Sequence, residues 1–199
     1  FIGSNLCKKL LEDKKNVVTI VDDLSSSRED YKGLINDFAE AEMLIKCYSD
    51  KDLLDRVRLK EFSTVFHVAA NPRVGYSVDF PHRTTDVNIT RTVALIEACI
   101  GNIDRFVFSS SSSVYGDNEL LPTTTDTQKK PKSPYAWHKS SIEDLLGIFS
   151  DLHGFDSVCL RYFNVFGPGQ YGGTAYSTAV AAWCDAIKNG KKLRSDGTG

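Results

Sequence analysis

Tyr135 and Lys139 are four residues apart, and a run of serines precedes them at Ser109–Ser113. A tyrosine and a lysine at positions i and i+4 lie on the same face of a helix. Tyrosine holds its proton until pH ~10, but a lysine cation ~4 Å away favours the phenolate by roughly 4 kcal/mol, or about three pKa units. The tyrosine then becomes a usable base near neutral pH. With a serine hydroxyl to orient an alcohol, these groups suit proton removal from the alcohol while hydride leaves its carbon.

Taken alone, a Y-x-x-x-K pattern also fits an amphipathic helix with a surface lysine. The start of the chain favours the chemical interpretation. A helical pattern begins near Ser4, the β-branched run Val17–Val21 follows, and Asp22 comes nineteen residues after Gly3. In a dinucleotide-binding βαβ unit, an acid about twenty residues past the glycine fingerprint accepts hydrogen bonds from the adenosine ribose. Asp22 could instead cap a strand, but this spacing favours ribose binding.

The ends of the chain suggest an excerpt of a longer protein. Gly3 would be the last glycine of the fingerprint, and the first strand and the other glycines are absent. The other end, Ser195–Gly199, is a turn-like segment without a closing element.

Composition narrows the class of protein. The net charge of −2 over 199 residues favours neither a nucleic-acid partner nor an acidic membrane. No apolar run reaches transmembrane length, and 41% hydrophobic residues suffice for a core. Five scattered cysteines and four scattered histidines indicate reduced thiols in a cytoplasmic protein and no metal site.

Strand-like runs alternate with helical patterns along the chain. Strands are expected at 17–22, 43–48, 64–69, 105–109 and 157–161, and helices near 4–14, 28–41, 51–60, 86–100 and 135–153. This alternation predicts an α/β fold with a doubly wound parallel sheet covered on both faces. Ligands of such sheets bind beyond the carboxyl ends of the strands. That rim would gather Asp22, Ala69-Ala70, Ser109–Ser113 and Tyr162–Asn164.

Several segments occur in an order that resembles a known family. They are Phe1-Ile2-Gly3-Ser4, Val21-Asp22-Asp23-Leu24, His67-Val68-Ala69-Ala70, Phe108–Gly116, Ser133-Pro134-Tyr135-Ala136-x-x-Lys139 and Arg161–Pro168. Together they resemble the extended short-chain dehydrogenase/reductases, and among these the NAD-dependent nucleotide-sugar epimerases and dehydratases. The resemblance implies a Rossmann-type NAD-binding domain over 1–165, without its first strand, and the beginning of a substrate-binding domain over 166–199.

The serine run separates the reactions of this family. By resemblance, Ser111 is the catalytic hydroxyl, and the dehydratases carry Asp and Glu at the next two positions. This chain has Ser112 and Ser113 there, neither of which is a carboxylic acid. The resemblance therefore favours an epimerase, and Arg161–Gly167 is similar to the corresponding segment of the UDP-hexose 4-epimerases.

The resemblance also assigns roles to residues. The catalytic set is Ser111, Tyr135 and Lys139. Cofactor-binding positions are Phe1, Ile2, Gly3, Asp22, Asp23, Ser25, Ser26, Ser27, Tyr48, Ala69, Ala70, Asn88, Ser109, Ser110, Tyr135, Lys139 and Tyr162. Substrate-binding positions are Arg73, Ser111, Ser112, Ser113, Tyr135 and Asn164. The cofactor is expected to be NAD rather than NADP, because Asp22 would repel a 2′-phosphate even though Arg28 is nearby.

The chain departs from the family pattern in three places. Cys47 replaces an acid that commonly binds the adenine amine, and Arg91 replaces the glycine of N-V-x-G-T. Pro72 and Arg73 stand where many epimerases carry a lysine-containing segment near the diphosphate. A thiol is a weak acceptor, so the adenine end is expected to be held less tightly.

The expected activity is 4-epimerisation of a UDP-hexose through a transient 4-keto intermediate. A UDP-glucuronate decarboxylase, a nucleotide-sugar reductase and a non-catalytic NAD-sensing protein of the same fold are the alternatives. The resemblance also implies a cytoplasmic homodimer that pairs through the helices near 86–100 and 135–153.

Overall fold

A computed structural model describes residues 1–25, 38–118, 121–172, 178–193 and 195. These residues fall into two compact units. The larger spans Thr19–Phe163, and the smaller combines Phe1–Val18 with Asn164–Gly199.

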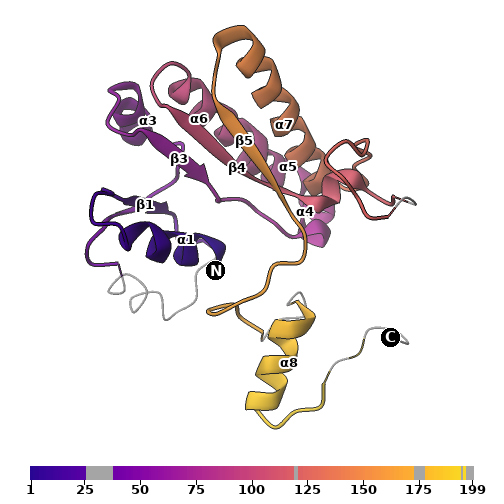
Figure 1. Cartoon of the computed structure of the whole chain (residues 1–199). Coiled ribbons are helices and arrows are strands. Elements are labelled where there is room, and N and C mark those ends of the chain that lie inside the picture. Colours follow the sequence, from indigo (N-terminus) through magenta and orange to yellow (C-terminus); the bar gives the residue numbers. More distant parts are fainter. Residues whose placement is uncertain (26–37, 119–120, 173–177, 194, 196–199) are drawn as a thin grey trace. The chain divides into compact units, whose positions relative to one another are not determined.

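The larger unit contains two parallel sheets (Figure 1). One pairs β1 (Thr19–Asp22) with β2 (Glu42–Ile45), and the other runs in the order β3 (Thr64–His67), β4 (Arg105–Ser111) and β5 (Ser157–Tyr162). These strands match the five runs expected from the sequence, apart from the exact ends. The two sheets correspond to positions 3-2 and 4-5-6 of the doubly wound strand order. None of the described strands occupies position 1 of that order.

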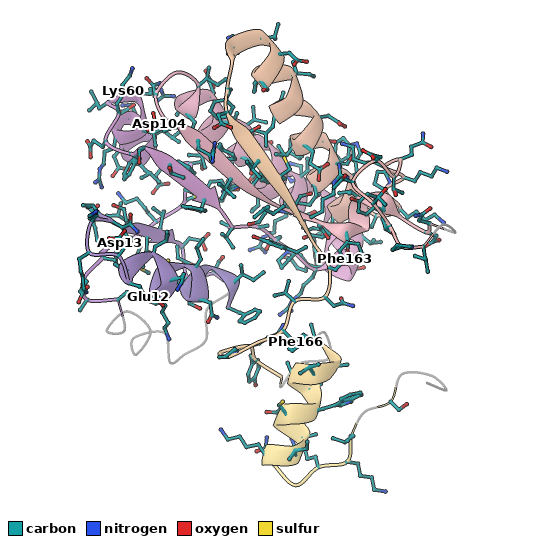
Figure 2. The ribbon with its side chains drawn as sticks, in the orientation of Figure 1. Glu12, Asp13, Lys60, Asp104, Phe163 and Phe166 are labelled. Carbon is teal, nitrogen blue, oxygen red and sulfur yellow. The ribbon has the colours of Figure 1, made fainter. Side chains whose placement is uncertain are left out.

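Parallel pairing brings the carboxyl ends of the strands to one edge of each sheet. His67 pairs in register with Phe108, and Ser111 at the end of β4 pairs with Tyr162 at the end of β5. Figure 2 shows Phe163 at this edge of the three-stranded sheet, with Lys60 and Asp104 at the opposite end. The serine run therefore lies at the edge where ligands of parallel sheets bind.

Helices follow the strands in the larger unit. They are α3 (Lys51–Arg58), α4 (Val74–Asp79), α5 (Pro81–Thr85), the π-helical turn η1 (Asp86–Thr90), α6 (Arg91–Cys99), the 3₁₀ turn η2 (Ser112–Tyr115) and α7 (Pro134–His153). The predicted helix at 86–100 exists, but its first turn is π-helical. Most of the predicted helix at 28–41 lies outside the described residues, and residues 38–40 form a turn. Nothing in the sequence pattern predicted α4 and α5.

The core packs α3, α6 and α7 against one face of the three-stranded sheet. Its members include Ile96 from α6, Phe106 and Phe108 from β4, and Ile142 and Leu146 from α7, all nearly inaccessible to solvent. Side chains on the other face remain partly exposed, namely Phe66, Val158 and Leu160. These three helices thus cover one face of the three-stranded sheet.

The smaller unit contains α1 (Ile2–Leu11) and α8 (Ala179–Lys188). Asn5 links its two segments, because its Nδ2 donates to the carbonyls of Phe1 at 2.9 Å and Pro168 at 3.0 Å. The helix expected near 4–14 is α1, whereas α8 had no counterpart in the predictions. Within the described residues, no helix combines the length and apolar character needed to cross a bilayer.

Candidate active site

Ser111 lies where β4 turns into η2. It is the N-cap of η2, and its Oγ accepts hydrogen bonds from the Ser113 backbone N–H at 3.2 Å and the Ser113 hydroxyl at 2.9 Å. Ser109 and Ser110 precede it in the buried part of β4. The serine run is thus an ordered strand end, and two donors from Ser113 hold the Ser111 oxygen in place.

Helix α7 brings Tyr135 to this serine. Ser133 caps the helix by accepting from Ala136 N–H at 3.1 Å, and Pro134 occupies the first turn, where its missing N–H costs nothing. The Tyr135 N–H donates to the buried Ser77 Oγ of α4 at 3.1 Å. The Tyr135 hydroxyl is close enough to the Ser111 hydroxyl for the serine to lower its pKa. The structure therefore brings together two predicted catalytic residues that are far apart in sequence.

Lys139 is buried one turn farther along α7. Its Nζ donates to the Ser109 carbonyl at 2.7 Å and lies 4.6 Å from the centre of the Phe108 ring. Burial lowers the pKa of Lys139 to about 8, and the nearby Glu143 carboxylate opposes this shift. The ammonium group thus belongs to a largely apolar environment next to the serine run.

The prediction that Lys139 lowers the pKa of Tyr135 is wrong. Burial raises the pKa of Tyr135, and the hydrogen bond with Ser111 offsets only part of that increase. Lys139 Nζ is 5.9 Å from the centre of the Tyr135 ring, and its hydrogen bond is to a backbone carbonyl. A lysine charge ~4 Å from the phenol would lower its pKa, whereas here the two groups are farther apart and the phenol is buried. Tyr135 consequently holds its proton firmly here and is in its proton-donating form.

Glu143 is a residue that the sequence reasoning missed. It is buried, and Arg161 from β5 binds it with Nε and Nη2, the closest distance being 2.7 Å. It also accepts from the Ser110 hydroxyl, and Lys129 Nζ lies 3.4 Å away. Burial raises the pKa of Glu143, but the bonds from Arg161 and Ser110 outweigh it, so the pKa is lowered. Its spacing, four residues after Lys139 on the same helix face, is the signal that could have identified it.

The loop after β3 is held by Asn88. This buried side chain accepts from Asn71 N–H at 2.8 Å and donates to the Asn71 carbonyl at 3.1 Å. Ala69 and Ala70 lie in the same loop, just before Asn71. Asn88 is thus placed to shape the loop by its hydrogen bonds. His138 is also buried and bonds Thr85 at 2.9 Å.

The carboxyl ends of β1 and β2 carry the residues expected at the adenosine end of a cofactor. The exposed Asp22 accepts from Leu24 N–H at 2.8 Å, and Asp23 accepts from the Ser25 N–H and hydroxyl. Ser26 and Ser27 lie outside the described residues. After β2, the Tyr48 hydroxyl donates to the Val87 carbonyl, and burial raises the pKa of Tyr48 to about 12.

The remaining predicted site residues divide between the two units. Ser112 and Ser113 form η2 beside Ser111, Tyr162 is the register partner of Ser111, and Arg73 is exposed at the start of α4. The others belong to the smaller unit and are described only within it. These are Phe1, Ile2 and Gly3 at the start of α1, and Asn164.

A comparison with protein families decides the affiliation of the chain. The profile of the NAD dependent epimerase/dehydratase family matches residues 1–199, which is the whole sequence. The chain belongs to this family. Its α/β fold is Rossmann-like, as the structures similar to it are short-chain dehydrogenase/reductase-type epimerases.

Individual members of the epimerase family resemble the chain over most of its length. A UDP-glucose 4-epimerase of Mycolicibacterium smegmatis is 33% identical over 201 residues, covering 100% of this chain and 64% of that protein. A solved UDP-N-acetylglucosamine 4-epimerase of Methanobrevibacter ruminantium is 39% identical with a TM-score of 0.87, covering 96% and 60%. The UDP-glucose 4-epimerase of Thermotoga maritima is 32% identical with a TM-score of 0.89, covering 100% and 63%. The chain thus spans less than two thirds of the length of these relatives.

Proposed function

We propose that the protein is an NAD-dependent nucleotide-sugar 4-epimerase that acts on a UDP-hexose. The proximity of Ser111 to Tyr135, together with the buried Lys139 ammonium one helical turn farther along α7, carries this proposal. The relatives named UDP-glucose or UDP-N-acetylglucosamine 4-epimerase support the choice of reaction.

The residues present fit a dinucleotide cofactor. An exposed carboxylate at the end of β1, Asp22, suits an adenosine ribose, and the buried Lys139 lies at the carboxyl edge of the other sheet. We assign Asp22 to the adenosine ribose and Lys139 to the nicotinamide ribose. Residues 1–3, 23, 25–27, 48, 69–70, 88, 109–110, 135 and 162 are the other proposed cofactor positions. NAD, when bound, supplies a hydride acceptor that can return the hydride to the same carbon.

The residues of the chain manage the proton. Once Tyr135 has released its own proton to solvent, it removes the proton from the sugar C4 hydroxyl and later gives one back, while Ser111 orients the sugar hydroxyl. The sugar passes through a 4-keto state and rotates before the hydride returns to its other face.

The polar residues around Ser111 support epimerisation over elimination. Ser112 and Ser113 carry neutral hydroxyls, which cannot act as the carboxylic acid and carboxylate that an elimination needs. We propose that they contact the sugar, together with Arg73 and Asn164. In this proposal residues 1–165 form the NAD-binding domain, and residues 166–199 begin a domain that completes the substrate site.

We also propose a cytoplasmic homodimer that pairs through α7 and the helical segment 86–100. The side chains of Trp137, Ile148 and Leu152 on α7 are each at least half exposed. Their spacing of eleven and four residues puts them on one helix face. This apolar stripe supports the pairing, because a partner helix would remove it from water.

Product analysis with three sugars tests the reaction. The purified protein is incubated separately with UDP-glucose, UDP-N-acetylglucosamine and UDP-glucuronate, without added NAD, and C4 epimers are resolved by chromatography. A new epimer in at least one tube is the expected result. Release of CO₂ instead would identify a decarboxylase, and consumption of added NADPH would identify a reductase; either result without an epimer contradicts the proposal.

A further inference from the structure

Cys47 and Arg91, two positions that depart from the family pattern, contact each other. Arg91 Nη1 donates to Cys47 Sγ at 3.3 Å, although the residues are 44 positions apart in sequence. Cys47 follows β2, and Arg91 is the first residue of α6. The two departures therefore belong to one local arrangement.

This pair lies at the carboxyl end of the β1–β2 sheet. Asp22 and Ile45 are register partners at the ends of the two strands, and Cys47 is the second residue after Ile45. The charge of Arg91 also acts on Asp23, next to Asp22. If Asp22 holds the adenosine ribose, the nucleobase attached to that ribose has the neighbouring strand end beside it. The pair of Cys47 and Arg91 occupies that neighbouring end.

The Arg91 guanidinium is held by its edges. Its Nε donates to Asp86 Oδ2 at 2.9 Å, its Nη2 lies 2.7 Å from the same oxygen, and its Nη1 is bonded to Cys47. The side chain is nevertheless 36% exposed. A guanidinium held in this way by bonds in its own plane can still offer a flat face, and such faces stack on aromatic rings.

Cys47 cannot replace the acid that is usual at its position. Its sulfur accepts from Arg91 and lies 3.2 Å from Ser49 Oγ. A thiol sulfur is a weak acceptor and carries no fixed negative charge. At position 47, an exocyclic amine on the base would therefore meet a thiol instead of a carboxylate.

We propose that Arg91, fixed by Cys47 and Asp86, binds the nucleobase of the cofactor by stacking on its guanidinium face, without an acceptor for the 6-amino group. The inference rests on the proposed NAD-dependent function. Its consequence is that the protein hardly distinguishes adenine from hypoxanthine, in which a carbonyl replaces the amine. A carboxylate in place of Cys47 would accept from the amine and repel the carbonyl.

Calorimetric titration of the nucleotide-free protein with NAD and with nicotinamide hypoxanthine dinucleotide tests the inference. The two dissociation constants are expected to agree within about threefold, whereas loss of a hydrogen bond to a charged group corresponds to about tenfold or more. A preference of tenfold or more for NAD would overturn the inference while leaving the cofactor proposal intact. Failure of both dinucleotides to bind would overturn the cofactor proposal and the inference with it.

Variants separate stacking from charge. Arg91→Lys keeps the charge but loses the flat face, and we expect it to weaken binding of both dinucleotides by about three- to tenfold. Arg105→Lys is the matched control, because Arg105 also pairs with an aspartate but lies at the start of β4 in the three-stranded sheet. This variant should bind both dinucleotides as tightly as wild type does. The double variant Cys47→Asp/Arg91→Gly should acquire a clear preference for NAD. If a folded Arg91→Lys protein bound both dinucleotides as tightly as wild type does, the role of Arg91 would be overturned. The comparison of the two dinucleotides on the wild-type protein decides the base preference even where a variant does not fold.

Discussion

At the scale of single residues, the candidate site contains a lysine whose charge is buried. The shift of the Lys139 pKa from 10.5 to about 8 corresponds to roughly 3 kcal/mol of unfavourable burial of the charged form. Its bond to the Ser109 carbonyl recovers part of that free energy. Burial of the Lys139 charge thus lowers the stability of the fold, although the proposed catalysis uses this residue.

Lys139→Met should therefore abolish turnover and raise the free energy of unfolding at pH 7 by about 1–3 kcal/mol, because no buried charge remains. The folded wild type binds fewer protons at this position than the unfolded chain between pH 8 and 10.5, so its stability rises with pH across that window. The advantage of the variant should shrink as pH approaches 10.5. Urea unfolding at pH 7 and pH 10 checks both statements, and a variant less stable than wild type at pH 7 would contradict them.

His67 should make the protein sensitive to acid. Burial lowers its pKa from 6.5 to about 3, and the Lys139 charge acts in the same direction. The neutral ring is bonded to Thr92 at 3.0 Å. Because the unfolded chain takes up this proton first, stability is complete above pH 6.5 and is lost as pH falls toward 3. His67→Asn keeps a polar side chain that does not titrate, so its unfolding free energy should fall less between pH 7 and pH 4. Equal acid slopes in the two proteins would refute this assignment.

At the scale of secondary-structure elements, an ion pair joins α7 to β5. Glu143 and Arg161 are bonded through two nitrogens, and the glutamate side chain is only 5% exposed. The same helix carries Tyr135 and Lys139, and the same strand ends at Tyr162 beside Ser111. The ion pair therefore fixes the helix against the strand next to the site.

Arg161→Met should destabilise the fold by about 3–5 kcal/mol, because it leaves a buried carboxylate without its main partner. Lys129, 3.4 Å from Glu143, should keep the loss toward the lower value. Arg105→Met is the control, since the Arg105–Asp156 pair is half exposed and such pairs contribute about 1 kcal/mol or less. Chemical denaturation measures both, and equal effects of the two substitutions would rule out the buried ion pair as the cause.

Much of this architecture could be predicted at the level of elements. The five strands follow from short β-branched or apolar runs, and α7 follows from its Ser133-Pro134 start and apolar periodicity. Helices α4, α5 and α8 escaped prediction: α4 and α5 are one or two turns long and are separated only by Phe80.

The sequence predicted which residues form the candidate site, but not the ion pair and pKa values there. Spacing and resemblance pointed to Ser111, Tyr135 and Lys139, and the structure brings these three residues together. The Glu143–Arg161 pair depends on which helix packs on which strand, which local sequence does not encode. The raised pKa of Tyr135 depends on burial, which a spacing of four residues does not reveal.

At the scale of the whole molecule, the proposed dimer can be tested on α7. Ile148→Asp combined with Leu152→Asp places two charges on the exposed stripe, where they would be buried in the proposed interface. Sedimentation should show a dimer for wild type and a monomer for the double variant. Leu59→Asp, at the end of α3, changes an equally exposed leucine outside the proposed interface and should leave the dimer intact. A monomeric wild type, or a double variant that still dimerises, would contradict the interface.

The central claim is that Tyr135 transfers the proton in a C4 epimerisation, and Tyr135→Phe tests it most directly. We compare wild type, Tyr135→Phe and the control Tyr76→Phe by the yield of C4 epimer from the sugar that wild type converts. The control removes a hydroxyl and keeps a phenyl ring on the neighbouring helix α4. We expect Tyr135→Phe to lose at least about 100-fold in rate, because a general acid–base group contributes about 10²–10⁴. NAD binding by that variant and turnover by Tyr76→Phe should be preserved. A Tyr135→Phe protein as active as wild type would contradict the account.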